Sequence, residues 1–335
     1  MAAVILHAEG DARTGLGHLV RMAGAAGELA AEYSVHLASA SPCLDAVVAE
    51  LAPWARGPFS VEALAPSDDH PWSRGQALSD ELSRLAEELG ARLLVSDGKA
   101  VFPDGAFSAP RESCRIVVVD NVVASPAAYD VLVLPTCHAD PAIVDRIGGS
   151  RVRTGAPWTF VHPAVRALVG RRRTERRGVF VSMGGADPNG LTERAVRHLV
   201  DAQPESVVAA VGPANRHRAT LLALAAEEPR LNLVSGSPDT HDALASSRWA
   251  LCAFGITTYE AVALNVPLVV VPHDGVIDGD IERFLSSFAG VRAVARPEMA
   301  TAPPCDSPTP APELGGLAAS LASAFLGNAP AGRGP

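Results

Sequence analysis

Short apolar runs alternate with helix-like stretches along this chain, and the alternation restarts after residue 165. Successive strands of a parallel sheet are joined by crossover helices, so this alternation predicts parallel α/β structure. The expected strands span residues 3–6, 34–37, 93–96, 116–119 and 131–134 in the first series, and 178–182, 207–211, 231–234, 249–253 and 267–271 in the second. Helices are expected between them, over residues 18–31, 79–89, 191–200, 219–226, 240–246 and 257–264. The predicted fold class is α/β, with two doubly wound, Rossmann-like domains.

The length of 335 residues suits two such domains of roughly 150 residues each. We expect an N-terminal domain over residues 1–165 and a C-terminal domain over residues 166–300, facing each other across a cleft. Residues 297–312 are rich in Pro, Ala, Thr and Ser, with little to bury. Residues 301–335 are therefore expected to form a flexible connector that can carry a returning helix over 314–326 and ends in a disordered tail.

The charge balance argues against one class of partner. The net charge is −9, from 28 Lys and Arg residues against 37 Asp and Glu residues. The one basic cluster of the sequence is a short run, Arg171 to Arg173 with Arg176 and Arg177. We interpret that run as an interdomain linker, since a nucleic-acid surface needs a longer basic stripe to neutralise phosphates. The sequence predicts small-molecule partners and no nucleic acid.

Hydropathy and cysteine usage bound the location of the protein. Apolar stretches stay shorter than the about 18 residues that a membrane helix needs, and the first strand has no basic leader before it. The five cysteines are odd in number and widely spaced, which fits neither a disulfide framework nor the close ligand pairs of a zinc site. We expect a cytoplasmic protein with reduced thiols, no membrane contact, no metal and no bound cofactor.

The first candidate site is the stretch R-T-G-L-G-H-L-V-R, which begins at Arg13 directly after the first strand. Gly15 and Gly17 allow a sharp turn, and the helix that follows presents unpaired N–H groups to a ligand. The same helix end disfavours a positive charge on His18, so a neutral, general-base imidazole is expected there. The alternative is a plain tight turn with His18 as a helix cap. A dinucleotide fingerprint would need a third glycine where Val20 stands, so nicotinamide binding is disfavoured.

Two further strand-to-helix turns lie in the second half. In S-M-G-G-A-D, Gly184 and Gly185 follow a strand and stand where a diphosphate rests in open parallel sheets. The alternative is an ordinary turn with Asp187 as the helix cap.

The other turn is F-G-I-T-T-Y-E, followed after one helix by N-V-P and a buried strand. Gly255 and the hydroxyls of Thr257 and Thr258, together with the first N–H groups of the helix, can hold a diphosphate without metal. Glu260, one turn further, can accept hydrogen bonds from ribose hydroxyls. Two such turns in one half make chance a weaker explanation than it is for either alone.

Carboxylates after the last buried strand form a second group of candidates. Asp278 and Asp280 make a D-x-D pair, which some metal-binding sites share, but carboxylates in a glycine-rich loop are commonly solvated. Helix termini can already neutralise a leaving diphosphate, so we interpret these carboxylates as contacts to sugar hydroxyls and not as metal ligands. Arg283 follows them as a candidate sugar contact.

Polar residues also end two strands of the first half. Asp97 and Asp120, with its neighbour Asn121, point toward the carboxyl edge of the expected sheet. They are candidate contacts to the sugar or the acceptor. Helix capping is an equally good interpretation. No G-x-S-x-G elbow or Cys–His arrangement supports nucleophilic catalysis.

The three motifs occur in an order that resembles a known group. R-T-G-L-G-H-L-V-R, then V-F-V-S-M-G-G-A-D over 179–187, then G-I-T-T-Y-E over 255–260 followed by N-V-P resemble the UDP-sugar hydrolases of pseudaminic acid biosynthesis. Relatives of those hydrolases are the spore-coat polysaccharide glycosyltransferases, and the glycosyltransferase that completes lipid II is more distantly similar. The resemblance covers most of residues 1–295 and implies the glycosyltransferase-B fold.

The resemblance also implies roles for particular residues. The position of His18 matches the catalytic base of the hydrolases, and Asp120 and Asn121 match an acidic pair. The positions expected to hold UDP are Gly184, Gly185, Gly255, Thr257, Thr258 and Glu260. Two family motifs are changed: D-H-Y reads Asp97-Gly98-Lys99, and an N-Q pair is replaced by the loop over 274–280. Those are sugar- and water-facing positions, so the reaction stays open while UDP binding is expected.

The leading hypothesis is a metal-independent glycosyltransferase that moves a sugar from a UDP-sugar to a small acceptor. One version resembles cytosylglucuronic acid synthases of nucleoside antibiotic biosynthesis, with UDP-glucuronate as donor and cytosine as acceptor. In that version Arg13 or Arg283 would meet the sugar carboxylate. The first alternative is a UDP-sugar hydrolase in which His18 activates water. The second is a UDP-sugar-binding protein without catalysis.

Overall fold

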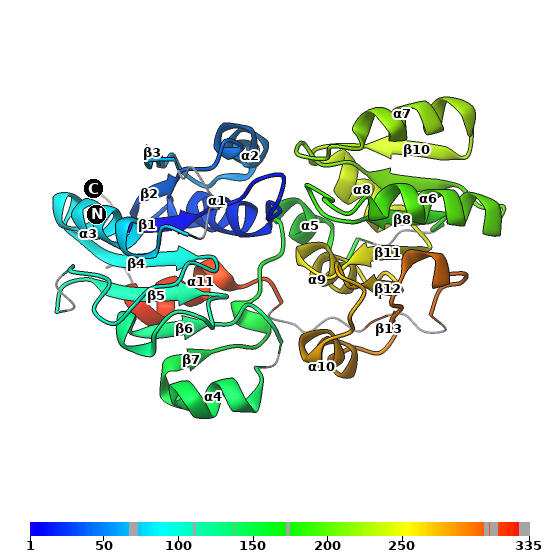
Figure 1. Cartoon of the computed structure of the whole chain (residues 1–335). Helices are drawn as coiled ribbons and strands as arrows, with labels where there is room; N and C mark the ends of the chain where they lie inside the picture. The colour runs from blue at the N-terminus through cyan, green and yellow to red at the C-terminus, as the bar shows by residue number, and fades with distance from the viewer. Residues whose placement is uncertain are drawn as a thin grey trace. The chain divides into compact units, whose positions relative to one another are not determined.

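The computed structural model describes residues 1–66, 73–109, 112–137, 139–171, 175–304, 308 and 314–327. Arg172 and Arg173 of the expected linker lie outside the described residues. So do most of the connector between 305 and 313, and residues 328–335 of the expected tail. The chain forms two compact units (Figure 1). Unit 1 comprises Met1–Gly10, His18–Thr159 and Gly316–Pro335, and unit 2 comprises Asp11–Gly17 and Phe160–Gly315.

Unit 1 is built on a seven-stranded sheet in which every neighbouring pair is parallel, in the order β3-β2-β1-β4-β5-β6-β7. Its strands are β1 Ala3–Ala8, β2 Ser34–Ser39, β3 Ser60–Ala63, β4 Ala91–Asp97, β5 Arg115–Val119, β6 Val131–Val133 and β7 Val152–Arg153. Its helices are α1 Gly17–Leu29, α2 Leu44–Leu51, α3 Gly75–Leu89, α4 Pro141–Ile147 and α11 Leu317–Leu321. Both faces of the central strands are buried, which explains why β5 reads as a continuous apolar run, I-V-V-V.

Unit 2 is built on a six-stranded parallel sheet in the order β10-β9-β8-β11-β12-β13. Its strands are β8 Val179–Ser182, β9 Val207–Ala210, β10 Leu231–Val234, β11 Trp249–Ala253, β12 Leu268–Val271 and β13 Val291–Ala293. Its helices are α5 Pro163–Leu168, α6 Leu191–Ala202, α7 Arg218–Glu227, α8 Asp239–Ser246, α9 Ile256–Ala263 and α10 Gly279–Ser287. Trp249 and Phe180 are among its largest fully buried side chains.

In each sheet the strand order reverses beside the first strand of the unit, between β1 and β4 in unit 1 and between β8 and β11 in unit 2. Chain segments that leave neighbouring strands at this point diverge to opposite sides, and the carboxyl edge there is the usual ligand site of an open α/β sheet. The predicted fold class, doubly wound parallel α/β, is confirmed. The fold therefore places two candidate ligand positions, one at each reversal point.

Several elements were not expected from the sequence. The strands β3, β7 and β13 have only two to four residues each, and β3 is an edge strand without a buried side chain. Helix α10 was not expected either, since it begins within the glycine- and aspartate-rich loop over 274–280 and buries only Ile281 and Phe284. Short, half-exposed elements lack the apolar pattern that reveals a buried strand.

The last described segment, coloured red in Figure 1, lies among the elements of unit 1. The N–H of Leu317, at the start of α11, donates to the Thr159 carbonyl at 3.1 Å. The Ser320 hydroxyl donates to the Pro157 carbonyl at 2.8 Å. Leu317 and Leu321 are fully buried. Unit 1 is thus assembled from segments separated by almost half of the chain.

Hydropathy within the helices gives one further result. Across the described ranges, no helix combines the length and the apolar character needed to cross a membrane.

Candidate functional site

The reversal point of unit 1 holds a compact group of charged side chains around His18. His18 lies in the first turn of α1, and Asp97 is the last residue of β4, paired in register with Ala8 at the end of β1. The Nδ1 atom of His18 lies 2.8 Å from Oδ1 of Asp97. Arg21, three residues after His18 on the same helix face, donates from Nε to Oδ2 of Asp97 at 2.7 Å and from its NH2 group to Oδ1 at 2.8 Å. A buried carboxylate therefore holds both side chains.

The charges in this group are compensated inside the fold. The Asp97 side chain has no exposed surface. Its burial would raise the pKa of the carboxyl, but the nearby Arg21 and then His18 outweigh this effect and hold that pKa below its usual range. Burial would likewise lower the pKa of Arg21, and Asp97 reverses the effect and raises it. Asp97 is thus ionised and Arg21 is charged.

An ionised Asp97 fixes the tautomer of His18. A carboxylate oxygen 2.8 Å from Nδ1 favours a hydrogen on that nitrogen, since two lone pairs at this distance would repel. The NH2 group of Arg21 also lies 3.1 Å from Nδ1, but its shorter contact, at 2.8 Å, is with Oδ1 of Asp97. The neutral ring then carries its lone pair on Nε2. His18 keeps 14% of its side-chain surface exposed, against none for Asp97. The geometry presents Nε2 as a proton acceptor, oriented by Asp97, as a general base requires.

Asp120 stands on the other side of the His18 ring. Its Oδ2 atom lies 4.0 Å from Nε2 of His18 and 3.6 Å from the NH2 group of Arg21, and 39% of its side chain is exposed. The backbone of Asp120 is left-handed, with φ of 55°, and its N–H donates to the Val133 carbonyl at 2.9 Å. Asp and Asn tolerate this conformation better than other non-glycine residues.

The neighbouring Asn121 has a different environment. Its side chain is buried, its Nδ2 donates to the Ala100 carbonyl at 2.8 Å, and its Oδ1 accepts from the Ala124 N–H at 3.0 Å. Both contacts stay within the loops after β4 and β5. Of the expected pair, the structure therefore brings Asp120 to His18, while Asn121 joins two loops.

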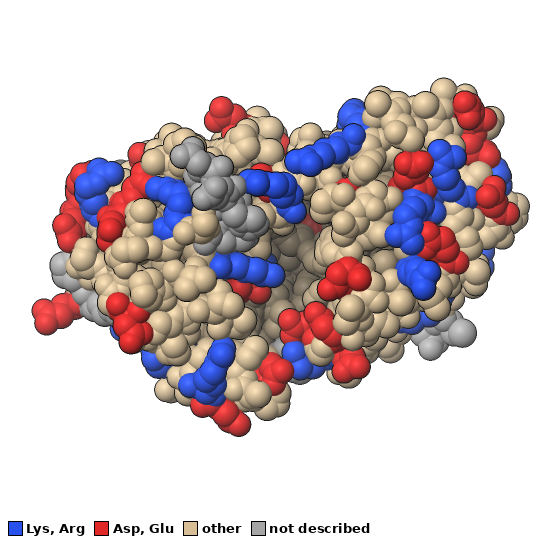
Figure 2. Space-filling model, viewed as in Figure 1, with Lys and Arg blue, Asp and Glu red and all other residues tan. Residues whose placement is uncertain are grey.

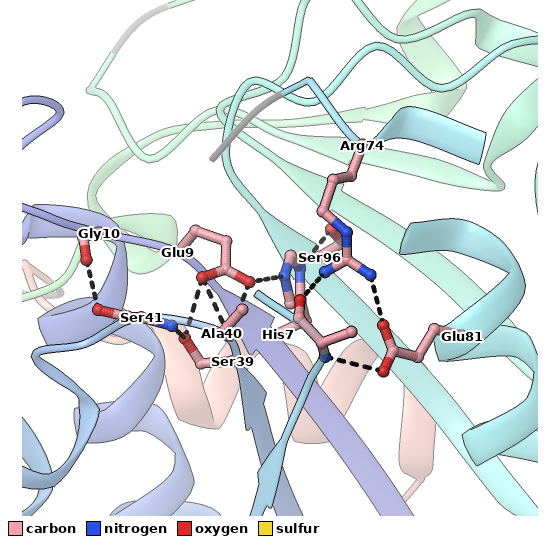
Figure 3. Close-up of polar contacts among 10 residues, drawn as sticks. His7, Glu9, Gly10, Ser39, Ala40, Ser41, Arg74, Glu81 and Ser96 are labelled. Atoms are coloured by element: carbon pink, nitrogen blue, oxygen red, sulfur yellow. Dashed lines mark hydrogen bonds and ion pairs between the residues drawn. The ribbon is translucent and has the colours of Figure 1, made fainter. Parts of the chain in front are cut away.

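A second polar network in unit 1, drawn in Figure 3, lies at the ends of β1, β2 and β4. Nδ1 of His7 is 2.9 Å from the Ser96 hydroxyl, and Nε2 of His7 is 3.2 Å from Oε1 of Glu9. Both oxygens of Glu9 accept from the Ala40 N–H, at 2.9 and 3.1 Å, and Oε2 also accepts from the Ser39 hydroxyl at 3.3 Å. All the side chains are buried. The network ties the segment after β1 to the segment after β2.

The glycine loop itself is closed by Asp11, in the segment that clusters with unit 2. Oδ1 of Asp11 accepts from the N–H groups of Arg13 and Thr14 at 2.8 and 2.7 Å and from the Thr14 hydroxyl at 2.8 Å. Nε of Arg13 donates to Oδ2 at 3.0 Å. Burial raises the pKa of Asp11, but these hydrogen bonds, from Thr14 and then Arg13, lower it to about 2. Gly15 has φ of 86°, as a tight turn requires.

In unit 2 the S-M-G-G-A-D turn follows β8 at the reversal point. Gly184 has φ of 89° and so needs glycine for its backbone conformation. Gly185 packs against the chain after β9 so closely that a Cβ at Gly212 would lie 2.3 Å from the Gly185 carbonyl oxygen. Asp187 accepts from the N–H groups of Leu191 and Thr192 at 2.8 and 2.9 Å. Asp187 thus holds the first two N–H groups of α6, although the N-cap residue of the helix is Gly190.

The G-I-T-T-Y-E turn follows β11, the strand that pairs with β8. Gly255 is exposed, its backbone is extended with φ of 165°, and a Cβ there would meet nothing within 4 Å. The fold therefore does not require glycine at this position. Thr258 is buried, and its hydroxyl donates to the Gly255 carbonyl at 2.5 Å, whereas Thr257 is half-buried. Gly255 is the N-cap residue of α9, and its carbonyl also accepts from the Thr258 N–H at 3.1 Å.

Glu260 lies one turn into α9, where it contacts two histidines. Its Oε1 accepts from the His162 N–H at 3.3 Å and lies 3.8 Å from Nε2 of His241. The two imidazole rings stack with centroids 4.4 Å apart. Burial, then His241 and Arg166, lower the pKa of His162 to about 3. The Glu260 carboxylate is thus held by the backbone N–H of His162, the N-cap residue of α5, and lies beside the side chain of His241 in α8.

The D-x-D pair forms a local helix cap in the structure. Oδ1 of Asp278 accepts from the N–H groups of Asp280 and Ile281, at 3.1 and 3.0 Å, and Asp280 pairs with Arg283 at 2.6 Å. Among the residues that the structure describes, no three His, Cys, Asp or Glu side chains group closely enough to hold a metal ion. On the face shown in Figure 2, acidic and basic side chains are intermixed over the described surface.

Comparison with known proteins gives a fold and a partial relative. No protein-family model matches the chain. The spore coat polysaccharide biosynthesis protein SpsG of Bacillus subtilis (strain 168) is 24% identical over 128 residues, which are 37% of this chain and 38% of that protein. The match thus spans less than half of the relative.

Three solved structures resemble nearly the whole chain. UDP-GlcNAc 2-epimerase of Methanocaldococcus jannaschii, in complex with UDP-GlcNAc and UDP, matches 90% of this chain and 91% of its own, with a TM-score of 0.62 and 10% identity. S. aureus MnaA in a UDP co-structure matches 98% of each chain, with a TM-score of 0.57 and 13% identity. WaaG, a glycosyltransferase involved in lipopolysaccharide biosynthesis, matches 89% of this chain and 88% of its own, with a TM-score of 0.53 and 12% identity. The chain has the glycosyltransferase-B fold.

Some residues of this glycosyltransferase-B chain escaped the sequence analysis. Arg21 was visible only as the end of the first motif, although its spacing of three residues from His18 places both on one helix face. Asp11, Glu9, His162 and His241 carry no local motif, since their partners are brought to them by the fold. The motifs thus identify the candidate site residues, and the fold brings to them the residues that orient them.

Proposed function

We propose that this chain is a metal-independent, UDP-sugar-dependent glycosyltransferase with His18 as its general base. The observation that carries the proposal is the pairing of His18 with a buried, ionised Asp97, which leaves the Nε2 lone pair as proton acceptor at the reversal point of the sheet. The fold, shared with glycosyltransferases and UDP-sugar epimerases, supports the class of substrate.

In the proposed reaction, Nε2 of His18 removes a proton from the attacking atom of the acceptor. That atom forms its bond to the anomeric carbon as the bond from this carbon to the UDP oxygen breaks, and UDP leaves with the electron pair. The imidazolium formed on His18 is stabilised by Asp97, because the Nδ1–H already donates to this carboxylate. Arg21 keeps Asp97 ionised and fixed through two hydrogen bonds.

Unit 2 supplies the proposed UDP site at the start of α9. Gly255 has an extended backbone and open space where a side chain would stand, so a close ligand explains the glycine better than the fold does. The helix N-terminus next to it offers N–H groups and a positive dipole end to a diphosphate. The roles of Gly184, Gly185 and Thr257 beside the diphosphate, and of Glu260 at the ribose, belong to the same proposal.

The donor sugar and the acceptor are finer parts of the proposal. Transfer of glucuronate from UDP-glucuronate to cytosine is one version, and hydrolysis of a UDP-sugar is the second candidate. Hydrolysis is favoured by one observation, the position of Asp120 beside Nε2 of His18. Arg13 and Arg283, the candidates to meet a sugar carboxylate, pair with Asp11 and Asp280 in this structure.

A UDP-sugar panel tests the proposal. The purified chain is incubated with UDP-glucuronate, UDP-GlcNAc and UDP-glucose, with and without cytosine, in the presence of EDTA, and released UDP is measured. We expect UDP release that His18→Ala reduces by about 1,000-fold while UDP affinity stays within about threefold. Acceptor-independent release would favour the hydrolase. Binding of a UDP-sugar without turnover would leave the non-catalytic alternative.

Gly255→Ala tests the UDP site separately. The extended backbone and the open space predict normal folding, with a melting temperature within about 2 °C of wild type. The added methyl group stands where the diphosphate approaches, so the UDP dissociation constant should rise by about tenfold or more. Unchanged UDP affinity in a folded Gly255→Ala protein would remove this turn from the proposed site.

A further inference from the structure

The distance between His18 and Asp120 restricts what can stand at the proposed base. Their facing atoms, Nε2 and Oδ2, are 4.0 Å apart, which is too long for a direct hydrogen bond. One atom that bonds to both at about 2.8 Å would span this gap with an angle of about 90° between its two contacts. That angle lies near the angle between the two hydrogens of water. The gap therefore fits one bridging oxygen, or a pair of neighbouring hydroxyls that each contact one of the two groups.

The chemistry of the two groups defines the bridge. Nε2 presents a lone pair, because Nδ1 carries the hydrogen that is donated to Asp97. An ionised carboxylate also accepts only. A single hydroxyl has only one hydrogen. If it donates this hydrogen to His18, only its oxygen lone pairs face the Asp120 carboxylate, which repels them. A nucleophile with two donors satisfies both acceptors.

Asp120 is fixed for this purpose from two sides. Its left-handed backbone, with φ of 55°, is held by the N–H bond to the Val133 carbonyl, and the NH2 group of Arg21 lies 3.6 Å from the same Oδ2 atom. With 39% of the side chain exposed, the carboxylate is open to an incoming molecule. Asp97 accepts on the inner side of the imidazole, and Asp120 faces the outer nitrogen.

We infer that Asp120 selects a nucleophile with two hydrogen-bond donors at its reacting end, namely water or a hydroxyl with a second hydroxyl on the adjacent carbon. This inference rests on the proposed function and names its class of acceptor. In the step, the reacting oxygen gives one hydrogen to Nε2 of His18 and bonds to the anomeric carbon, while UDP departs with the electrons of the broken bond. The second hydrogen stays on the product and is held by Asp120 throughout.

A partition experiment tests the selection. The UDP-sugar that gives the fastest UDP release is incubated with equal concentrations of ethylene glycol and propan-1-ol. The two alcohols have nearly the same size, but ethylene glycol has two hydroxyl donors and propan-1-ol has one. The glycosides are quantified by mass spectrometry, per hydroxyl group. We expect wild type to favour ethylene glycol by about tenfold, the worth of one good hydrogen bond. Cytosine, with one N–H at its reacting ring nitrogen, should react no better than propan-1-ol.

Asp120→Asn is the test variant, because Asn tolerates the left-handed backbone and its amide can donate as well as accept. Its preference for ethylene glycol should fall below about threefold. Asp140→Asn is the matched control and should keep the wild-type preference. Asp140 caps α4, and Asn is an equally good capping residue. An equal preference in wild type and Asp120→Asn, or faster transfer to cytosine than to ethylene glycol, would overturn the inference alone. No UDP release from any UDP-sugar with any nucleophile would overturn the proposed function, and this inference with it.

Discussion

Replacing Asp97 with Asn tests the reasoning about the base most directly, because it changes one oxygen of a buried side chain into an amide nitrogen. Three hydrogen bonds reach the two oxygens, one from His18 and two from Arg21. An amide can accept at only one of the two positions, so at least one donor faces the new NH2 group. The variant also removes the negative charge that would stabilise an imidazolium.

The magnitude has two parts. Loss of the orienting charge at a general-base histidine costs about 1,000- to 10,000-fold in kcat, or about 4 to 5.5 kcal/mol in the activation barrier. Arg21 is left charged in the interior without its main partner, which costs about 3 kcal/mol of unfolding free energy. Asp120, 3.6 Å from the Arg21 NH2 group, should reduce this second cost. Stability and catalysis are therefore both expected to fall, for different reasons.

Steady-state UDP release and urea denaturation separate these two effects. Adding Arg21→Met to Asp97→Asn removes the unpaired charge, so the double variant should recover about half or more of the lost stability without recovering activity. His18→Ala should lower activity as far as Asp97→Asn does. A folded Asp97→Asn protein that keeps kcat within about threefold of wild type would refute the assignment of Asp97 as the residue that orients the base.

Three other substitutions probe features around the site. The pKa of His162 is about 3 in the folded chain and near 6.5 in the unfolded chain, so the unfolded chain binds a proton first as the pH falls. The unfolding free energy of unit 2 should therefore fall by up to about 4 kcal/mol between about pH 6.5 and 3. His162→Asn, which keeps the helix cap, should abolish this loss in pH-dependent denaturation. The pKa of Asp11 is about 2 in the folded chain, below its ordinary value of 3.8, so its contribution to stability is complete above about pH 4 and fades toward pH 2. The difference in melting temperature between wild type and Asp11→Asn should shrink over that range. A constant difference would contradict the lowered pKa of Asp11. Glu9→Gln places an amide hydrogen toward a donor such as the Ala40 N–H and should lower the unfolding free energy by about 1 to 3 kcal/mol in urea, whereas an unchanged midpoint would mean that the network relaxes around it.

The central strands were predictable because parallel strands buried on both faces read as unbroken apolar runs. The expected strand over 249–253 matches the central strand β11 residue for residue. Three of the four edge strands were missed, since β3 buries no side chain and β7 and β13 have two and three residues. The fourth edge strand, β10, was predicted over 231–234 because its sequence, L-N-L-V, is mostly apolar.

The site divides in the same way. His18, Asp97 and Asp120 could be named because each follows a strand at the carboxyl edge, where the topology gathers such residues. Their mutual geometry could not be named, since the ion pair of Asp97 with Arg21 depends on packing between α1 and β4. Sequence also left the role of Asp187 open, and in the structure its carboxylate accepts from the first two N–H groups of α6, whose N-cap residue is Gly190.

The return of α11 to unit 1 has a consequence for how the chain is made. Unit 1 needs both the segment that ends at Thr159 and the segment that starts at Gly316, and unit 2 is encoded between them. At a synthesis rate of about 5 to 20 residues per second, roughly 10 to 30 seconds separate these two segments on the ribosome. The apolar surface that Leu317 and Leu321 finally cover stays open during that interval. The unit that emerges first is therefore the last to be completed, and it is the part of the nascent chain with most need of a chaperone.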